Sequence, residues 1–234
     1  MTLPVVDAGR PHFPEHERAL REGRLVNVVN YHVTPAADAP ELERQLAAYL
    51  EHFDPVLPEH LDAWWATGRW PLRRPGFAPV FYDGHREQAT VAAPLCESLG
   101  ITAWFMPPTG FVDCPVEDQV AFCDRHDLWL PPDPHPDGRV ALSWDELAAI
   151  GRRHVLCGHT ATHATPSDVR TDEDVERELA APFRRLAAIA TAEPAVLAWR
   201  LGLPDDPAEP ASAAVREVGY RYLVSATKLQ RLRR

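Results

Sequence analysis

Three side chains of the kinds that bind metal ions follow two apolar runs of this sequence. Asp83 comes directly after the run 77–82, and His159 and His163 come shortly after the run 154–157. Both runs have the composition of buried strands, and the strands of α/β folds carry ligands at their carboxyl ends. One carboxylate and two imidazoles can hold a divalent cation and leave coordination positions open for a substrate. The sequence therefore predicts a metal site formed by Asp83, His159 and His163.

A purely structural interpretation of the same residues stands beside this one. The chain contains 11 histidines among 234 residues, so two of them can fall four apart by chance. One of the two would then cap a helix and the other would lie at the surface. Asp83 followed by Gly84 is first of all a turn signal. Their shared position at strand ends is what favours the metal site.

The elements that must position these residues alternate between strands and helices. Apolar and β-branched runs predict buried strands, and amphipathic stretches between them predict helices. Pro94 is expected to kink its helix or end it early, and Pro182 to interrupt its helix. The alternation indicates an α/β fold with about seven mostly parallel strands in a sheet or barrel. The expected strands are 25–33, 79–82, 101–106, 154–158, 196–200 and 220–225, and the expected helices are 41–53, 58–66, 86–99, 116–125, 143–152, 171–186 and 211–218.

Length and composition bound the class of protein. With 234 residues, 45% of them hydrophobic and 25% charged, the chain suits a single domain over residues 1–234. Residues 1–24 are polar and proline-containing, so an irregular N-terminal segment is expected there. The formal net charge of -10 argues against a nucleic-acid partner, because phosphate binding needs a basic face.

The sequence shows no feature of secretion or of a membrane protein. The first residues lack a basic region followed by an apolar core, and no apolar run approaches the roughly 20 residues of a membrane span. The four cysteines show no C-x-x-C pairing, as expected for reduced thiols. We therefore expect a cytoplasmic protein without a membrane partner.

Five segments, in the same order along the chain, resemble the polysaccharide deacetylases of carbohydrate esterase family 4. Asn30-Tyr31-His32 looks like the first-strand motif of many members. Phe81-Tyr82-Asp83-Gly84 stands where the family has Phe-Asp-Asp-Gly, and His159-Thr160-Ala161-Thr162-His163 matches its His-Ser/Thr-x-x-His. Residues 142–147 and 214–221 resemble the segment before the histidine motif and the late helix–strand joint. The likeness runs from about residue 25 to residue 226.

The resemblance implies a fold, a cofactor and a reaction. The fold is a distorted, incomplete (β/α) barrel of about seven mostly parallel strands, which agrees with the alternation above. The cofactor is a divalent metal of the zinc type, held by Asp83, His159 and His163. Such a cation would polarise an acetamide carbonyl and bind the attacking water. The implied reaction is removal of an acetyl group from an N-acetylated sugar or a related amide.

The chain also departs from the family pattern where the family has its acid and base. The family's general base is the first Asp of the Asp-Asp pair, and Tyr82 stands in its place. A phenol, with a reference pKa of about 10, is a poor base at neutral pH unless its pKa is strongly perturbed. The third family motif corresponds to residues 198–202, which places Arg200 near the site. The late Leu-His motif that supplies the family's general acid is expected after the last strand, and the given sequence ends before such a motif.

Several residues are candidates to complete such a site. Tyr82 could donate a hydrogen bond, and His85 and Glu87 could carry protons, unless they lie on an exposed first helical turn. His32 could face the mouth of the barrel, or be a satisfied core histidine. Aromatic side chains that could stack on a sugar ring, or belong to the core instead, are Tyr31, Trp104 and Trp199.

The leading hypothesis is a metal-dependent deacetylase, a hydrolase of non-peptide carbon–nitrogen bonds. Its expected cytoplasmic setting favours a small or nucleotide-linked sugar over a cell-wall polymer. The alternative is a catalytically degenerate deacetylase fold that keeps a metal or ligand site but does not hydrolyse. The sequence is also compatible with a homo-oligomer in which a partner chain completes the barrel. Replacing Tyr82 with Asp is expected to raise any deacetylase activity, because it restores the missing carboxylate.

Overall fold

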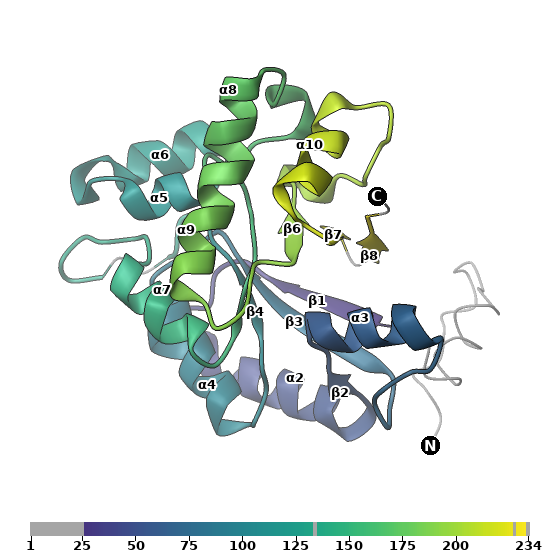
Figure 1. The fold of residues 1–234 in the computed structure, drawn as a ribbon. Coiled ribbons are helices and arrows are strands. Elements are labelled where there is room, and N and C mark those ends of the chain that lie inside the picture. Colours follow the sequence, from purple (N-terminus) through teal and green to yellow (C-terminus); the bar gives the residue numbers. More distant parts are fainter. Residues whose placement is uncertain (1–25, 133–134, 227, 233–234) are drawn as a thin grey trace, which may run out of the picture.

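Five strands form the larger sheet of the protein, and all their pairings are parallel. The computed structural model describes residues 26–132, 135–226 and 228–232, so the expected irregular segment 1–24 lies outside the described residues. The strand order is β1-β3-β4-β5, and the short β2 pairs with β3 (Figure 1). The bounds are β1 Val26–Tyr31, β2 Asp54–Pro55, β3 Gly76–Tyr82, β4 Trp104–Met106 and β5 Val155–Leu156.

A smaller sheet continues the curve of the first one. It contains β6 (Val196–Ala198), β7 (Tyr222–Ser225) and β8 (Lys228–Arg231). β6 and β7 are parallel, whereas β8 returns antiparallel to β7. An isolated parallel bridge between Gly158 and Leu197 links the end of β5 to β6. The mostly parallel α/β architecture expected from the sequence is confirmed.

The strands curve into a barrel that stays open between its first and last members. β8 lies near β1, but no backbone ladder joins these two strands within the described residues. Instead the Asn30 amide donates to the carbonyl of Ala226 at 3.1 Å. The expectation that strand 220–225 ends the fold is wrong, because Lys228–Arg231 adds an edge strand. Its polar, basic sequence gives no strand signal.

The helices pack outside the larger sheet, so this sheet separates a helix-covered apolar core from one in the barrel interior. β3 is buried along its whole length, as is usual for a central parallel strand. Its alternate residues face opposite sides: Phe77 and Phe81 pack against α2, α4, α7 and α9, whereas Val80 and Tyr82 face the barrel interior. The helix bounds are α2 Ala39–His52, α3 Pro58–Thr67, α4 Ala93–Ser98, α5 Thr109–Asp113, α6 Gln119–His126, α7 Trp144–Gly151, α8 Asp172–Val175, α9 Ala181–Ile189 and α10 Pro210–Val218. None of the helices in the described ranges is both long and apolar enough to span a bilayer.

The two helices with internal prolines continue through them. A π-helical turn, Gln88–Ala92, precedes Pro94, and another, Glu176–Ala180, precedes Pro182. Proline cannot donate the usual backbone hydrogen bond and its ring crowds the preceding turn. The wider π turn accommodates both effects. Interruption of the α-helix was therefore predicted correctly, while termination of the helix was not.

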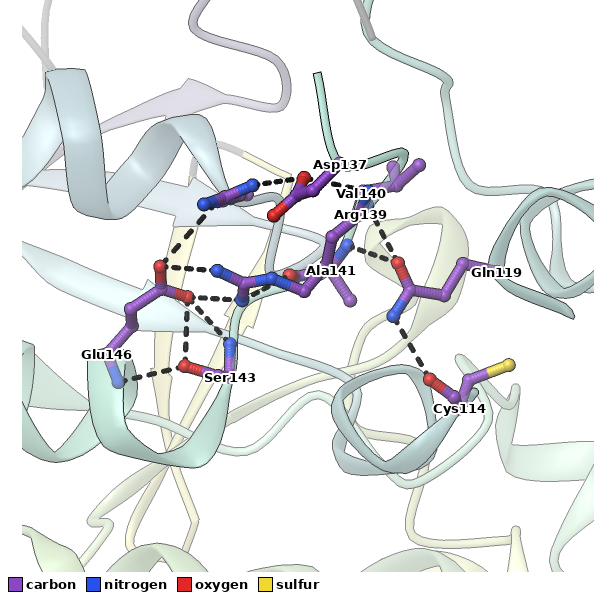
Figure 2. A network of polar contacts seen from close by, with 9 residues as sticks. Cys114, Gln119, Asp137, Arg139, Val140, Ala141, Ser143 and Glu146 are labelled. Atoms are coloured by element: carbon purple, nitrogen blue, oxygen red, sulfur yellow. Dashed lines mark hydrogen bonds and ion pairs between the residues drawn. The ribbon is translucent and has the colours of Figure 1, made fainter. Parts of the chain in front are cut away.

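A polar network connects the long segment between β4 and α7, which contains α5 and α6, to the residues that follow β3. The Gln119 side chain accepts hydrogen bonds from the backbone N–H groups of Val140 and Ala141 and donates to the carbonyl of Cys114 (Figure 2). Arg139 forms a double hydrogen bond with Glu146, which also closes the capping box of α7 with Ser143. Residues 140–142 in turn bond the backbone of residues 84–86.

Gly158 offers a test of how tightly the two sheets are joined. A Cβ atom at this position would lie 2.3 Å from the Tyr220 hydroxyl and 2.7 Å from Cζ of that buried ring. We expect Gly158→Ala to lower the free energy of unfolding by about 1–3 kcal/mol, the usual cost of overpacking. The measurement is chemical denaturation.

The control is Tyr220→Phe, which removes a buried hydroxyl that has no hydrogen-bond partner. Because nothing is left unpaired, that variant should be neutral or stabilising. In combination with Gly158→Ala it should recover part of the loss. Equal stability of Gly158→Ala and the parent would show that the joint is looser than described.

Candidate metal centre

Asp83, the first candidate ligand, stands in a left-handed turn at the end of β3. Asp83 has φ 73°, and its N–H donates to the carbonyl of Met106 on the neighbouring strand at 3.1 Å. Gly84 continues the turn with φ 68°, and a Cβ there would lie 2.9 Å from Cβ of Pro107. Glycine is therefore required by conformation and by space. The turn leaves the Asp83 carboxylate buried, at 2% exposure.

The two histidines stand on a turn that follows β5, not on a helix. Thr160 and His163 have φ values of 61° and 58°. The Thr160 hydroxyl accepts a hydrogen bond from the N–H of Ala164 at 2.8 Å. The buried Glu178 carboxylate accepts from the Ala161 and Thr162 N–H groups, at 3.1 and 2.9 Å. These bonds hold both imidazoles in the site.

The three side chains converge on one point. Oδ1 of Asp83 lies 3.7 Å from Nε2 of His159 and 4.0 Å from Nε2 of His163. One ligand atom from each residue lies within 4.8 Å of the others, and all three residues are buried. The structure thus brings together the carboxylate and the two imidazoles, as predicted from the two strand ends.

The outer atoms of these side chains are held by partners that fix their orientation. Nδ1 of His159 donates to the carbonyl of Ala198 at 2.8 Å, and Nδ1 of His163 donates to that of His126 at 2.7 Å. Because a carbonyl only accepts, each neutral ring presents an unprotonated Nε2 to the site. The second Asp83 oxygen, Oδ2, accepts from Nδ1 of His32 at 2.8 Å. Metal-binding histidines and carboxylates are usually oriented in this way.

The inner atoms, by contrast, lack the partners that burial demands. Oδ1 of Asp83 and Nε2 of His159 are buried and have no hydrogen-bond partner. Leaving such groups unpaired costs about 1–3 kcal/mol each, and more when they are charged. A divalent cation would satisfy both atoms together with Nε2 of His163. The donor set therefore fits a cation of the zinc type.

The protonation states also suit cation binding. Burial alone raises the pKa of the Asp83 carboxyl, but the neighbouring His159 and His32 rings outweigh it and hold that pKa below its usual range. Burial, reinforced by the His159 ring, lowers the pKa of His163 to about 4. At neutral pH the site therefore holds a carboxylate and a neutral His163 ring whose Nε2 carries no proton. A cation would not have to displace a proton from either of them.

The ligands lie in a cleft of about 300 Å³ at the carboxyl ends of the strands. Four other residues predicted from the sequence line it, namely His32, Tyr82, Trp199 and Arg200. Tyr82 is 6% exposed, and burial raises the pKa of its hydroxyl above the usual value, as do the nearby Cys157 and Asp83. Its hydroxyl donates to the Asn30 side chain at 3.4 Å. Tyr82 is thus a hydrogen-bond donor and not a base.

Two predicted aromatic platforms do not line this cleft. Tyr31 stacks on Phe81 at 5.1 Å between ring centroids, on the helix-covered side of the sheet. Trp104 is fully buried, and its indole donates to the carbonyl of Val56 at 2.9 Å. The alternation of side chains along β1 explains the position of Tyr31. Trp104 is on the interior face, but it stands at the start of β4, level with Val80 and not with the strand end. The prediction that Tyr31 and Trp104 contact a sugar does not fit these positions, and the core alternative does.

The two predicted proton carriers are also absent from the cleft lining. His85 is fully buried beside Phe111, with 5.9 Å between their ring centroids, and Glu87 is 5% exposed. They do not lie on an exposed helical turn either, because residues 140–142 cover this segment. A role for His85 and Glu87 as proton carriers at the cleft finds no support in their placement.

Two residues that line the cleft were not predicted from the sequence. Asp127 ends α6, and its carboxylate forms an ion pair with Arg200, 2.7 Å from Nη1 to Oδ2. Trp129 is 63% exposed, and its ring centroid lies 4.8 Å from that of His32. Both lie in the long irregular stretch 107–139, whose length is itself typical of functional loops. No residue pattern inside that stretch singles them out.

The backbone at the cleft is unusually rich in left-handed residues. Outside glycine, the positive φ angles of the described chain belong to Asp83, Asp127, Thr160, His163, Leu201 and Ala226. All of these except Thr160 line the cleft. Each such conformation costs of order 1–3 kcal/mol, and such residues cluster at functional sites. The backbone therefore points to the same cleft as the side chains do.

The fold is shared with known deacetylases. The structure is similar to that of a de-N-acetylase from Aggregatibacter actinomycetemcomitans, with a TM-score of 0.65 and 16% identity over 88% of this chain and 90% of that one. It is also similar to the Streptococcus pyogenes deacetylase PplD, solved in complex with acetate, with a TM-score of 0.61 and 14% identity over 83% and 80% of the chains. IcaB from Ammonifex degensii matches with a TM-score of 0.61 and 17% identity over 88% and 86%.

These matches support the polysaccharide deacetylase resemblance at the level of the fold. No protein-family model matches the sequence, and no curated protein matches it either. At identities this low the fold alone is shared, so chemistry must be argued from the residues of the cleft.

Substitution of the ligands and of their partners should affect cation affinity in a graded way. We expect His163→Ala to abolish tight zinc binding, because a donor atom is lost. His32→Ala should weaken binding about 10–100-fold, since it frees the Asp83 carboxylate to rotate. The measurement is isothermal titration calorimetry on metal-free protein. His52→Ala, on the exposed side of α2, is the control; an equal effect of all three changes would contradict the assignment.

Proposed function

We propose that the protein is a metal-dependent hydrolase that removes an acetyl group from an N-acetylated sugar or a related amide. The observation that carries this proposal is the buried, unpaired Oδ1 of Asp83 facing two imidazole nitrogens with defined tautomers. The shared fold of known deacetylases supports the type of reaction. Bound in this site, a divalent cation supplies Lewis-acid polarisation of the carbonyl and acidifies a water molecule.

The residues around the ligands divide the remaining tasks. His32 holds Asp83 through Nδ1, and its ring is about one-third exposed, so Nε2 is left to meet a substrate. Tyr82, kept protonated by burial, provides a hydroxyl donor beside the site. Arg200 contributes a positive charge at the rim, where it pairs with Asp127. Together these groups offer a polar substrate an imidazole nitrogen, a hydroxyl donor and a guanidinium.

The aromatic residues of the cleft suit a sugar ring. Trp129 exposes most of its indole at the rim, whereas Trp199 is almost fully buried in the lining. An exposed indole presents an apolar face to the C–H groups of a sugar. Leu201 extends this apolar rim with 76% exposure. We assign sugar stacking to Trp129 in place of the residues predicted from the sequence.

The alternative function is a binding protein that keeps the cation but does not hydrolyse. The observation that favours it is Tyr82, because a protonated phenol replaces the carboxylate that the resemblance implies at this position. Zinc content alone does not separate the two functions. Turnover does.

The decisive experiment measures metal content and acetate release on the same preparation. We expect about one divalent ion per chain and release of acetate from N-acetylglucosamine oligomers or smaller N-acetylated sugars. Asp83→Asn should lose both, because an amide oxygen is a weaker ligand than a carboxylate. Stoichiometric metal without acetate release from any such substrate would favour the binding protein. Absence of metal after reconstitution with zinc would exclude both functions.

Trp129→Ala tests the sugar platform. Loss of the stacking face should raise KM for a sugar substrate about 5–20-fold, the equivalent of about 1–2 kcal/mol, with kcat changed much less. Steady-state kinetics provide the measurement. Trp65→Ala, an exposed tryptophan on α3 outside the cleft, is the matched control and should leave KM unchanged. An unchanged KM in Trp129→Ala would remove this residue from the binding surface.

A further inference from the structure

Within the described residues, the cleft is lined by two carboxylates, and one of them is already used. Asp83 is a ligand of the candidate metal centre, and Asp127 is the other. Asp127 adopts the left-handed conformation with φ 53° and ψ 41° at the C-terminal end of α6. Its side chain is 72% exposed. It is therefore open to solvent and substrate.

Asp127 is tied to the metal centre from two sides. The carbonyl of the preceding residue, His126, accepts the hydrogen bond that orients the His163 ring, at 2.7 Å. The Asp127 carboxylate accepts a hydrogen bond at Oδ2 from Nη1 of Arg200, at 2.7 Å. The Arg200 backbone N–H in turn donates to the carbonyl of Ala164, next to His163, at 3.2 Å. The same short segment thus orients a ligand and presents a carboxylate.

The helix that carries Asp127 is firmly anchored. Gln119 in the first turn of α6 bonds Val140, Ala141 and the Cys114 carbonyl (Figure 2). At the other end of α6, the Phe122 and His126 rings lie 4.3 Å apart by centroid, and Phe122 stacks on the core residue Phe111. A general base must be held in position to act. These contacts meet that requirement.

We propose that Asp127 is the general base of the hydrolysis and that Arg200 positions it; this inference rests on the proposed function. Asp127 takes one proton from the attacking water, whose oxygen forms a bond to the acetyl carbonyl carbon. The C–N bond then breaks, its electron pair passes to nitrogen, and the nitrogen receives the proton held by Asp127. The products are a free amine and acetic acid, which ionises at neutral pH, and the carboxylate is regenerated. A carboxylate from α6 thus replaces the one that Tyr82 displaced at the end of β3.

The first test compares two carboxylates of the same helix. Asp127→Asn should lower kcat/KM about 10²–10⁴-fold, the usual contribution of a general base, with metal content unchanged. Asp124→Asn removes the same charge from the exposed side of α6, outside the cleft, and should stay within about twofold of the parent. Adding Tyr82→Asp to Asp127→Asn should restore part of the lost activity. A loss below about threefold in Asp127→Asn, with zinc bound, would overturn the proposal.

A second readout does not depend on turnover. Acetohydroxamate chelates zinc and shares a proton with a neighbouring carboxylate, so calorimetry on zinc-loaded protein reports whether Asp127 faces the cation. We expect Asp127→Asn to weaken its binding at least about 10-fold and Asp124→Asn to leave it unchanged. Equal binding to all three proteins would overturn the inference. If the parent protein binds zinc but shows no turnover, the proposed function is wrong. The hydroxamate comparison would still show whether Asp127 faces the cation.

Discussion

The buried carboxylate of Asp83 is the constraint on which the arrangement of the strand ends depends. Asp83 is almost inaccessible to solvent, and a buried charge costs several kcal/mol unless it is compensated. One of its oxygens is compensated by His32 from the end of β1, while the other faces the imidazoles that follow β5 without a hydrogen bond. Three strand ends must therefore meet for Asp83 to be tolerated. The open barrel with its carboxyl-end cleft is the architecture that brings them together.

To bring these strand ends together, the backbone adopts conformations that the rest of the fold has to support. Left-handed residues at Asp83, His163 and Asp127 each cost free energy. The Glu178 carboxylate holds the histidine turn, and residues 140–142 hold the segment after Asp83. The polar contacts outside the cleft are thus the support for strained ligand positions. Loss of these supports would disturb the site before it disturbed the core.

The sequence predicted the parts that depend on local pattern. Apolar runs located the core strands, and polar residues at two strand ends located the three candidate ligands. It did not predict Asp127 or Trp129, because they reach the cleft only through the tertiary placement of α6. Tyr31 and Trp104 were left open between sugar contact and the core, because an aromatic residue on a strand carries no signal of its face or of its depth in the sheet. His85 was expected at either the cleft or the surface, and its burial depends on residues some 55 positions later.

We infer that Asp83, His159 and His163 together hold one divalent cation. Anomalous X-ray scattering at the zinc edge, on crystals grown after zinc reconstitution, tests it most directly. We expect one strong peak about 2.0–2.2 Å from Oδ1 of Asp83 and from Nε2 of both histidines. An absent peak, or a direct hydrogen bond between Asp83 Oδ1 and one of these rings, would contradict it. The cleft would then be a structural feature shared with deacetylases and not a metal centre.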